Sequence, residues 1–226
     1  MLFYLPDFQN PVLPETEALH CLKVLRKKTG DHILVSDGKG TKAEAEILGD
    51  NPKKCLLKLR DISTLPKGWK NEVWLAVAPT KQMERMEWLV EKCTEIGIDG
   101  LIFIKTERTE RDVLKLERLE KTALSAMKQS GQAWLPELKW QAHWKQFPWA
   151  DFQHIYCADL GTDALASIPK KEGKSLIFIG PEGDFTKQEI LEIYTHEAAP
   201  VRLRPHVLRT ETAGIYALSL FHFGQI

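Results

Sequence analysis

The chain has 226 residues, with 31 Lys and Arg against 31 Asp and Glu, so its formal net charge is zero. Hydrophobic residues make up 43% and charged residues 27%, an average composition that excludes a disordered, a collagen-like and a histone-like basic chain. A chain of this length buries enough surface for one large core or two smaller ones.

The compartment and the redox state can be predicted from simple patterns. The longest uncharged apolar run, Val73–Pro79, is far shorter than the roughly 20 residues that a membrane-spanning helix needs. The first residues lack the charged start, apolar stretch and cleavage site of a secretion signal, so we expect a cytoplasmic protein without membrane contact. Cys21, Cys55, Cys93 and Cys157 are widely spaced among apolar neighbours, which predicts four buried thiols and no metal site.

The first part of the chain, residues 1–68, reads as short strands separated by tight turns. Glycine and Asx residues stand between the apolar segments, as tight turns require, and this pattern predicts a small barrel or meander. The strands are expected at Phe3–Leu5, Ile33–Val35, Lys42–Leu48 and Cys55–Leu59.

One helix, Glu15–Lys27, is expected to interrupt these strands. Its apolar spacing places Leu19, Leu22 and either Leu25 or Val24 on one buried face.

A change of pattern at Leu65–Gly68 predicts a domain boundary there. Beyond it, apolar runs of strand length alternate with amphipathic segments of helix length, which is typical of a mostly parallel sheet covered on both faces. The strands are expected at Val73–Ala78, Leu101–Ile104, Ile155–Ala158, Leu176–Ile179 and Val201–Leu203, and the helices at Gln82–Ile96, Asp112–Gln129, Thr186–His196 and Thr210–Phe223.

Several helix ends are also predictable. Gly97 follows an apolar stripe that reaches Ile96, as expected for a helix C-terminus. Thr186 stands three residues before Glu189, the spacing of a capping box, and Thr210 is expected to cap the last helix. The buried stripe of the helix Asp112–Gln129 is expected to begin at Val113.

Charge is divided between the two parts. Residues 1–70 carry 12 Lys and Arg against 9 Asp and Glu, a net charge of +3, and the remainder carries −3. The densest cationic cluster lies on the first helix and its exit, and it indicates either an RNA-binding surface or a solvated helix face. Its members are His20, Lys23, Arg26, Lys27 and Lys28.

Two loops are the places to look for chemistry, because ligands of parallel sheets settle beyond the carboxyl ends of the strands. In Gly180–Phe185 the glycines allow a ligand to approach bare backbone, although a plain strand-to-helix turn is the alternative. Leu203–Ala213 concentrates polar and ionisable side chains beside the core, which is costly unless they are used. The chain lacks the Walker, GxGxxG, HExxH and GxSxG motifs.

These loops resemble the RsmE family of 16S rRNA uridine methyltransferases, members of the SPOUT superfamily. The motifs that carry the resemblance are Gly180–Gly183 and, some 25 residues later, Val207–Ala213, whose Arg-Thr-Glu-Thr-Ala string is the specific element. The resemblance spans almost the whole chain. Further matching segments are His20, Val24–Arg26, Gly30–Asp31, Lys81–Glu87, Thr94–Gly97, Glu107–Thr109 and Gln129–Gly131.

The resemblance implies an α/β fold with a PUA-like RNA-binding β-barrel in residues 1–68 and a SPOUT methyltransferase domain in residues 69–226. It also implies a C-terminal trefoil knot, a homodimer and S-adenosylmethionine as cofactor, held mainly by backbone groups. The implied cofactor residues are Gly180, Pro181, Glu182, Gly183, Leu203, Leu208, Thr210, Thr212 and Ala213, and the implied RNA contacts are His20, Lys23, Arg26, Lys27 and Arg108.

Three positions depart from the family pattern. The family usually has glycine where this chain has Asp184 and Arg204, and arginine where it has His206. Asp adopts a left-handed backbone more readily than most residues, so cofactor binding is expected to survive there. The bulk of Arg204 is expected to alter how closely its loop meets the methionine moiety.

The implied reaction is methylation of nitrogen 3 of a uridine. Arg209 is the candidate for stabilising the uracil anion, and Glu211 or Glu182 for accepting or orienting the proton. An ion pair of Arg209 with either glutamate, holding the loops together, is the structural alternative. Two other functions stay open: a SPOUT enzyme for another RNA or a ribose 2′-hydroxyl, and a non-catalytic RNA-binding factor in ribosome assembly.

Overall fold

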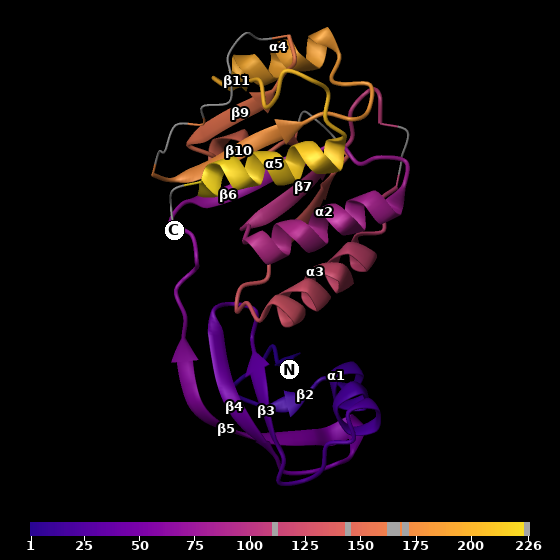
Figure 1. The fold of residues 1–226 in the computed structure, drawn as a ribbon, viewed down its shortest axis with the longest axis vertical. Helices are drawn as coiled ribbons and strands as arrows, with labels where there is room; N and C mark the ends of the chain where they lie inside the picture. Colours follow the sequence, from indigo (N-terminus) through magenta and orange to yellow (C-terminus); the bar gives the residue numbers. More distant parts are fainter. Residues whose placement is uncertain (110–112, 143–145, 162–167, 169–171, 224–226) are drawn as a thin grey trace. The chain divides into compact units, whose positions relative to one another are not determined.

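The computed structural model describes residues 1–109, 113–142, 146–161, 168 and 172–223. The chain divides into two compact units, one of residues 1–67 and 124–135 and the other of residues 68–123 and 136–226 (Figure 1). In the described part of the chain, no helix is both long and apolar enough to span a bilayer.

The first unit is built on a five-stranded sheet with the order β1-β3-β4-β5-β2. β1 pairs parallel with β3, and the other pairings are antiparallel. Alternate residues of β4, Ala43, Ala45 and Ile47, are buried, as expected for a strand with one face on a core. The strands are β1 Leu2–Tyr4, β2 Val12–Leu13, β3 His32–Ser36, β4 Thr41–Ile47 and β5 Cys55–Thr64, and a short 3₁₀ helix, η2, covers Pro52–Lys54.

The helix of the first unit differs from the sequence prediction. It consists of α1, Glu15–Leu19, followed by a π-helical turn η1, His20–Val24, so it ends before Lys27. The wider turn rotates the buried face onto Ala18, Cys21 and Leu22, while Leu19, Val24 and Leu25 are exposed. The prediction of the face was therefore right only for Leu22.

Residues 124–135 pack into the first unit, which the sequence did not indicate. The amide of Gly40 donates to the carbonyl of Ala133 at 2.9 Å, and the amide of Leu135 to Gly38 at 2.8 Å. The ammonium of Lys128 pairs with the buried carboxylate of Glu17. The backbone bonds attach the segment to the turn between β3 and β4, and the ion pair attaches it to α1.

The second unit contains a six-stranded, all-parallel sheet with the order β11-β9-β10-β6-β7-β8. This confirms the predicted parallel sheet. The strands are β6 Glu72–Val77, β7 Gly100–Ile104, β8 Glu137–Gln141, β9 His154–Ala158, β10 Lys174–Ile179 and β11 Ala199–Val201.

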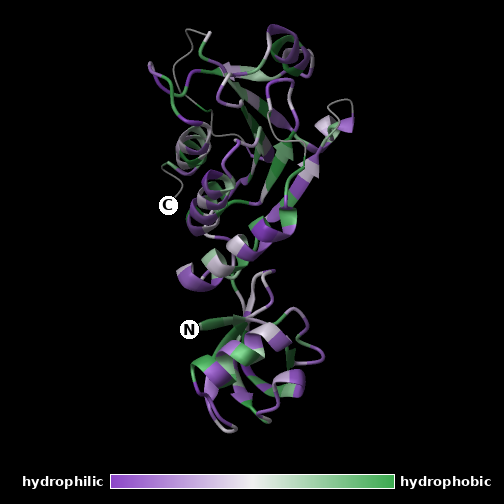
Figure 2. Ribbon diagram, turned by 90° about the vertical axis from the view of Figure 1, so that its right-hand side faces the viewer, coloured by the Kyte–Doolittle hydropathy of each residue, from purple (hydrophilic) through white to green (hydrophobic). Residues whose placement is uncertain are grey.

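Helices cover both faces of this sheet. α2, Met83–Ile96, packs against α5, Thr210–His222, which lies across β6 and β10 (Figure 1). On the other face, α4, Lys187–Thr195, contributes Ile193 to a core that also contains Phe147 and Phe178. The strands of this sheet are largely green in Figure 2, whereas the helices mix purple and green, as expected for buried strands between amphipathic helices.

Helix ends in the second unit confirm some predictions and correct others. Gly97 ends α2 with φ +102°, and Thr186 forms the predicted capping box with Glu189. Ile96, however, is exposed, because it lies in the last turn beyond the buried stripe. Arg209 takes the N-cap position of α5, so Thr210 is its first helical residue.

Three further elements differ from expectation. α3 spans Leu116–Ser130, Val113 precedes it and is exposed, and Asp112 lies outside the described residues. β11 ends at Val201, which leaves Leu203 in the following loop. The short strands β2 and β8 were not predicted. Two residues are too few to show a period, whereas the alternation of polar and apolar residues in β8 is a strand signal that could have found it.

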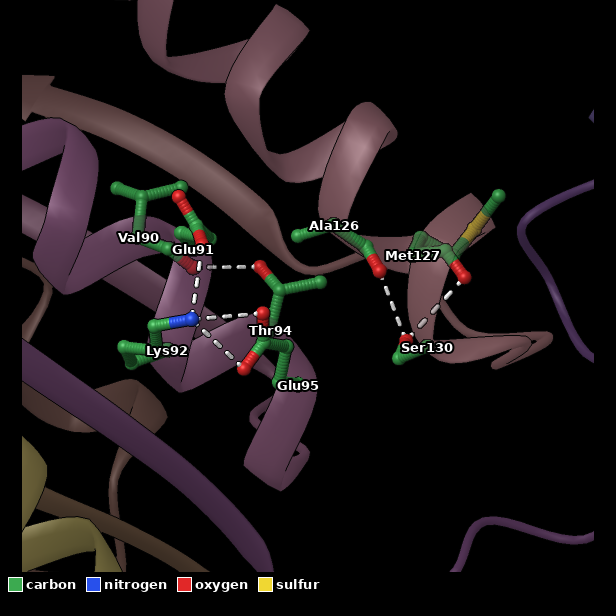
Figure 3. Close-up of polar contacts among 8 residues, drawn as sticks. All are labelled: Val90, Glu91, Lys92, Thr94, Glu95, Ala126, Met127 and Ser130. Atoms are coloured by element: carbon green, nitrogen blue, oxygen red, sulfur yellow. Dashed lines mark hydrogen bonds and ion pairs between the residues drawn. The ribbon is translucent and has the colours of Figure 1, made fainter.

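Several polar side-chain contacts on α2 and α3 lie within a single helix. The ammonium of Lys92 contacts the carboxylates of Glu91 and Glu95 at 2.8 and 3.0 Å (Figure 3). The hydroxyl of Thr94 donates to the carbonyl of Val90, and that of Ser130 to Ala126 (Figure 3). These contacts are local to one helix each, whereas helices in proteins gain most of their stability from tertiary packing.

The four cysteines are buried and free, as predicted. Burial raises the pKa of the Cys55 thiol to about 11, and it raises those of Cys93 and Cys157 further. These thiols therefore stay protonated at neutral pH and are poor nucleophiles. Among the described residues, no group of His, Cys, Asp and Glu could hold a metal ion.

Candidate functional site

A cavity of about 260 Å³ lies beyond the carboxyl ends of three neighbouring parallel strands, β9, β10 and β11. This is the edge at which ligands of parallel sheets bind. Both loops that the sequence singled out contribute to it. The lining residues are Ala158, Asp159, Leu160, Ile179, Gly180, Pro181, Glu182, Gly183, Asp184, Leu203, Arg204, His206, Val207, Leu208, Thr210 and Ala213.

Most of the predicted cofactor residues come together at this cavity. Eight of the nine line it, and Thr212 does not, because it points to solvent from the first turn of α5. The loop after β9 was missed by the sequence reasoning. Asp159 and Gly161 directly follow that buried strand, which is the signal that could have found it.

The two predicted loops are tied to each other. The hydroxyl of Thr210 donates to the carbonyl of Gly180 at 2.9 Å. Gly180 has no room for a side chain, since a Cβ there would lie 2.9 Å from Asp184 Oδ1 and 3.3 Å from the amide nitrogen of Phe185. The glycine thus allows the loop to fold tightly enough to leave backbone facing the cavity.

Asp184 adopts the left-handed backbone that a glycine would take, with φ +61°. Its carboxylate accepts from the amide of Phe185 at 2.8 Å, a local hydrogen bond that helps Asp to hold this conformation. Burial raises the pKa of this carboxyl group, and the nearby charge of Asp159 raises it further, whereas the Phe185 amide and Arg108 act in the opposite direction.

Asp159 is the second carboxylate of the cavity wall. Its oxygens accept from the Tyr194 hydroxyl and the Gly161 amide, both at 2.7 Å. Burial and the hydrogen bond to Asp159 raise the pKa of Tyr194, so the phenol remains a donor at neutral pH.

The predicted catalytic residues occupy different environments. Arg209 is exposed at the start of α5, whereas Glu211 is buried and Glu182 is about half exposed. Neither Arg209 nor Glu211 lines the cavity. The suggested ion pairs of Arg209 with the glutamates are not formed, because a different arginine lies between the two carboxylates.

That arginine is Arg85 of α2, which the sequence reasoning did not select. Its guanidinium lies 3.4 Å from Glu182 Oε1 and 3.8 Å from Glu211 Oε1. Glu211 Oε2 is buried and accepts no hydrogen bond from any described residue. A buried carboxylate oxygen without a partner is destabilising, and such groups are found at functional sites.

The two departures in the last loop also line the cavity. Arg204 is exposed, with its guanidinium 5.7 Å from the centre of the Tyr216 ring, and His206 is exposed nearby. Arg204 thus lines the cavity while its guanidinium lies over the Tyr216 ring of α5.

The predicted RNA-binding residues fall into two groups. Lys23 and Arg26 are exposed on the first unit, His20 and Lys27 are half-buried there, and Arg26 has a left-handed backbone with φ +56°. Strained backbones of this kind cluster at functional sites. Arg108 lies in the second unit instead, where its guanidinium donates to the carbonyl of Gly183 at the cavity.

A ligand that fits this cavity has polar groups that can hydrogen-bond to the exposed backbone. It also carries a positive charge that can interact with the carboxylates of Asp159 and Asp184. Gly180 and Gly183 have no side chains and so expose backbone to the cavity, while Leu203, Leu208 and Ala213 supply apolar side chains. S-adenosylmethionine meets this description, since its adenine ring has flat apolar faces, its ribose carries hydroxyl groups and its sulfonium is positively charged.

Comparisons with known proteins point to one family. The model of an RNA methyltransferase domain matches residues 67–222, and that of an RNA methyltransferase PUA domain matches residues 13–60. "Ribosomal RNA small subunit methyltransferase E" of Synechocystis is 30% identical over 90% of this chain and 70% of its own length.

Two solved structures resemble the fold closely. A "probable rRNA-methyltransferase" from Porphyromonas gingivalis has a TM-score of 0.89 at 38% identity, covering 99% of this chain and 98% of that one. A protein from Legionella pneumophila, solved with the bound cofactor SAM, has a TM-score of 0.87 at 26% identity, covering 98% and 96%.

Proposed function

The chain belongs to the RsmE family of S-adenosylmethionine-dependent ribosomal RNA small subunit methyltransferases, and from this premise we propose that it methylates nitrogen 3 of a uridine in 16S rRNA. The cofactor cavity at the carboxyl ends of β9, β10 and β11 is the observation that carries the proposal. The cofactor supplies an electrophilic methyl group on a sulfonium. The chain's own residues must hold it, exclude water and remove the proton of the uracil ring.

The proton must leave nitrogen 3 before or as the methyl group arrives. We assign stabilisation of the resulting anion to Arg209, because its guanidinium is exposed beside the cofactor loop and so can reach a substrate. Glu211 or Glu182 accepts or orients the proton, and Arg85 holds both carboxylates in place. Arg85 is a positioning residue in this assignment.

Binding of the rRNA falls to the first unit. Lys23, Arg26 and Lys27, with His20, neutralise phosphates and so position the strand without reading much sequence. Arg108, anchored on Gly183, contacts the RNA near the cofactor. Nitrogen 3 is occupied in a Watson–Crick pair, so the target uridine must be unpaired or flipped outward.

Three further properties belong to the same proposal. The chain acts as a homodimer, for which the exposed Trp88 and Ile96 of α2 offer apolar surface. The chain after β10 is threaded into a trefoil knot, as in the superfamily it resembles. The enzyme works in the cytoplasm, where its ribosomal substrate is assembled.

The test is a product analysis. Purified protein, S-adenosylmethionine and small ribosomal subunits from a strain lacking the gene should yield one methylated uridine, which mass spectrometry of nuclease fragments identifies as 3-methyluridine. A 2′-O-methyl product, or a product in another RNA, would replace the proposal with a different SPOUT activity. Calorimetry that detects no binding of S-adenosylmethionine would leave a non-catalytic assembly factor.

A further inference from the structure

Two carboxylates that the proposed reaction does not use face the same cavity. Asp159 follows β9 and Asp184 follows β10, and these strands are parallel neighbours with Cys157 paired to Phe178. Because the C-terminal ends of β9 and β10 lie next to each other, Asp159 and Asp184 lie on the same side of the cavity. Glu182 also lines it, but Arg85 lies 3.4 Å from that carboxylate and compensates its charge.

Hydrogen bonds fix both carboxylates in place. Asp159 accepts from Tyr194 and from its own loop at Gly161, each at 2.7 Å. Asp184 Oδ1 accepts from Phe185 at 2.8 Å, and it packs so closely on Gly180 that a Cβ there would lie 2.9 Å away. Two charges held in this way cannot turn out to solvent when a ligand enters.

The charges on these acids are only partly compensated by the protein. Asp184 is half-buried and repelled by Asp159, and burial is the main reason that the pKa of its carboxyl group is raised. Arg108 is the cation that acts on Asp184, but its guanidinium is shared with the Gly183 carbonyl. A positive charge inside the cavity would relieve the repulsion between the two acids.

We propose that Asp184, supported by Asp159, makes this cavity favour the positively charged methyl donor over its demethylated product. The inference rests on the proposed function. Methyl transfer converts a sulfonium into a neutral thioether, so S-adenosylhomocysteine carries one positive charge fewer than the donor. The acids attract the donor and lose that attraction once the methyl group has left, which favours exchange of product for fresh donor.

Asp184 allows a clean test because two substitutions fit its backbone. Asp184→Asn keeps the shape and the acceptor for the Phe185 amide while removing the charge, and Asn tolerates the left-handed region. Asp184→Gly restores the residue that φ +61° favours most. Glu117→Gln removes one charge from an exposed position on α3 and serves as the control.

The experiment is calorimetry of the full chain with three ligands. They are S-adenosylmethionine, S-adenosylhomocysteine and sinefungin, which carries an ammonium where the donor carries its sulfonium. The unmodified chain should bind the donor more tightly than the product. Asp184→Asn should lower the affinity for the donor and for sinefungin about tenfold, and that for the product less than about twofold. Asp184→Gly should narrow the donor-to-product ratio similarly, and Glu117→Gln should not change it.

The outcomes separate this inference from the proposed function. If the unmodified chain binds neither donor nor product, the methyltransferase function fails. A different outcome is that the unmodified chain binds both while Asp184→Asn changes the affinity for all three ligands by the same factor, or for none of them. In that case the charge of Asp184 does not help the cavity to distinguish donor from product. Equal or tighter binding of the product to the unmodified chain overturns the inference without any variant. Thermal unfolding of each variant checks that the fold is retained.

Discussion

Arg209 and Arg85 both belong to the second unit, but their surroundings give them different roles. Arg209 is exposed, and its side chain makes no capping hydrogen bond to α5. Arg85 is three-quarters buried between the carboxylates of Glu182 and Glu211. An exposed guanidinium can meet an incoming substrate, whereas one enclosed by carboxylates keeps those carboxylates in place.

Replacing Arg209 with alanine should abolish methyl transfer while leaving the protein folded. Since the side chain is exposed and caps nothing, the melting temperature should change by no more than about 2 °C. Loss of one preorganised cation at a developing anion typically lowers the rate by about 100-fold or more. Transfer of a radiolabelled methyl group to small ribosomal subunits measures the rate, and calorimetry should show donor binding within about threefold of the unmodified chain.

Arg209→Lys is the matched variant for this experiment. It keeps the charge but loses the planar donor pair, so partial activity is expected. Activity close to normal in Arg209→Ala would remove this arginine from the mechanism and direct attention to Arg85.

At the scale of elements, the end of α2 is a tightly constrained junction of the second unit. Gly97 has φ +102°, and a Cβ there would lie 2.4 Å from two ring atoms of Trp69. That ring is itself fixed, because its indole nitrogen donates to Asp99 at 2.9 Å. The Gly97 carbonyl also accepts from His222 at the end of α5, so one glycine joins two helices.

Gly97→Ala should therefore lower the free energy of unfolding by about 3 kcal/mol. About 1–2 kcal/mol comes from forcing an L-residue into the left-handed region and the rest from displacing the ring. Urea unfolding followed by tryptophan fluorescence measures the change. Gly68→Ala is the control, since its Cβ would meet nothing within 4 Å and its backbone is not left-handed, and it should change the free energy by less than about 0.5 kcal/mol. Equal effects of the two substitutions would show that the ring can move freely.

At the scale of the whole molecule, the total charge is zero but it is unevenly distributed along the chain. The first 70 residues carry a net charge of +3 and the remainder −3. The exposed Lys23 and Arg26 lie on the positive part, while the cofactor cavity on the negative part is walled by Asp159 and Asp184. A polyanion and a cationic cofactor are thus attracted to different units.

The double substitution Lys23→Ala and Arg26→Ala should weaken binding of 16S rRNA fragments and flatten its salt dependence. Each phosphate contact contributes about 0.7–0.9 to the slope of log affinity against log salt concentration, so losing two should reduce the slope by about 1.5. Fluorescence anisotropy at several salt concentrations gives the slope. Lys115→Ala with Lys121→Ala removes the same charge from the second unit, where both residues are exposed, and serves as the control. Equal slopes for the unmodified chain and for the variant Lys23→Ala with Arg26→Ala would show that these two residues do not contact RNA phosphates and only contribute to solubility.

The sequence by itself determined the local structure and the places to search. Alternation of strands and helices predicted the parallel sheet, Thr186 and Glu189 predicted a capping box, and both are present. Asp184 was expected to accept a left-handed backbone, and it does. The capping box and the left-handed backbone depend on neighbouring residues, and the type of sheet follows from an alternation that repeats along the chain, so both are visible in the sequence.

Only the tertiary structure decided which distant residues meet. Arg85 reaches Glu182 and Glu211 across more than 90 residues of chain, and Asp159 joins Asp184 because β9 pairs with β10. A π-helical turn rotated the face of the first helix away from its 3.6-residue pattern. Strand order and long-range packing fix such contacts, and no local periodicity records them, because they depend on the free energy of the whole fold.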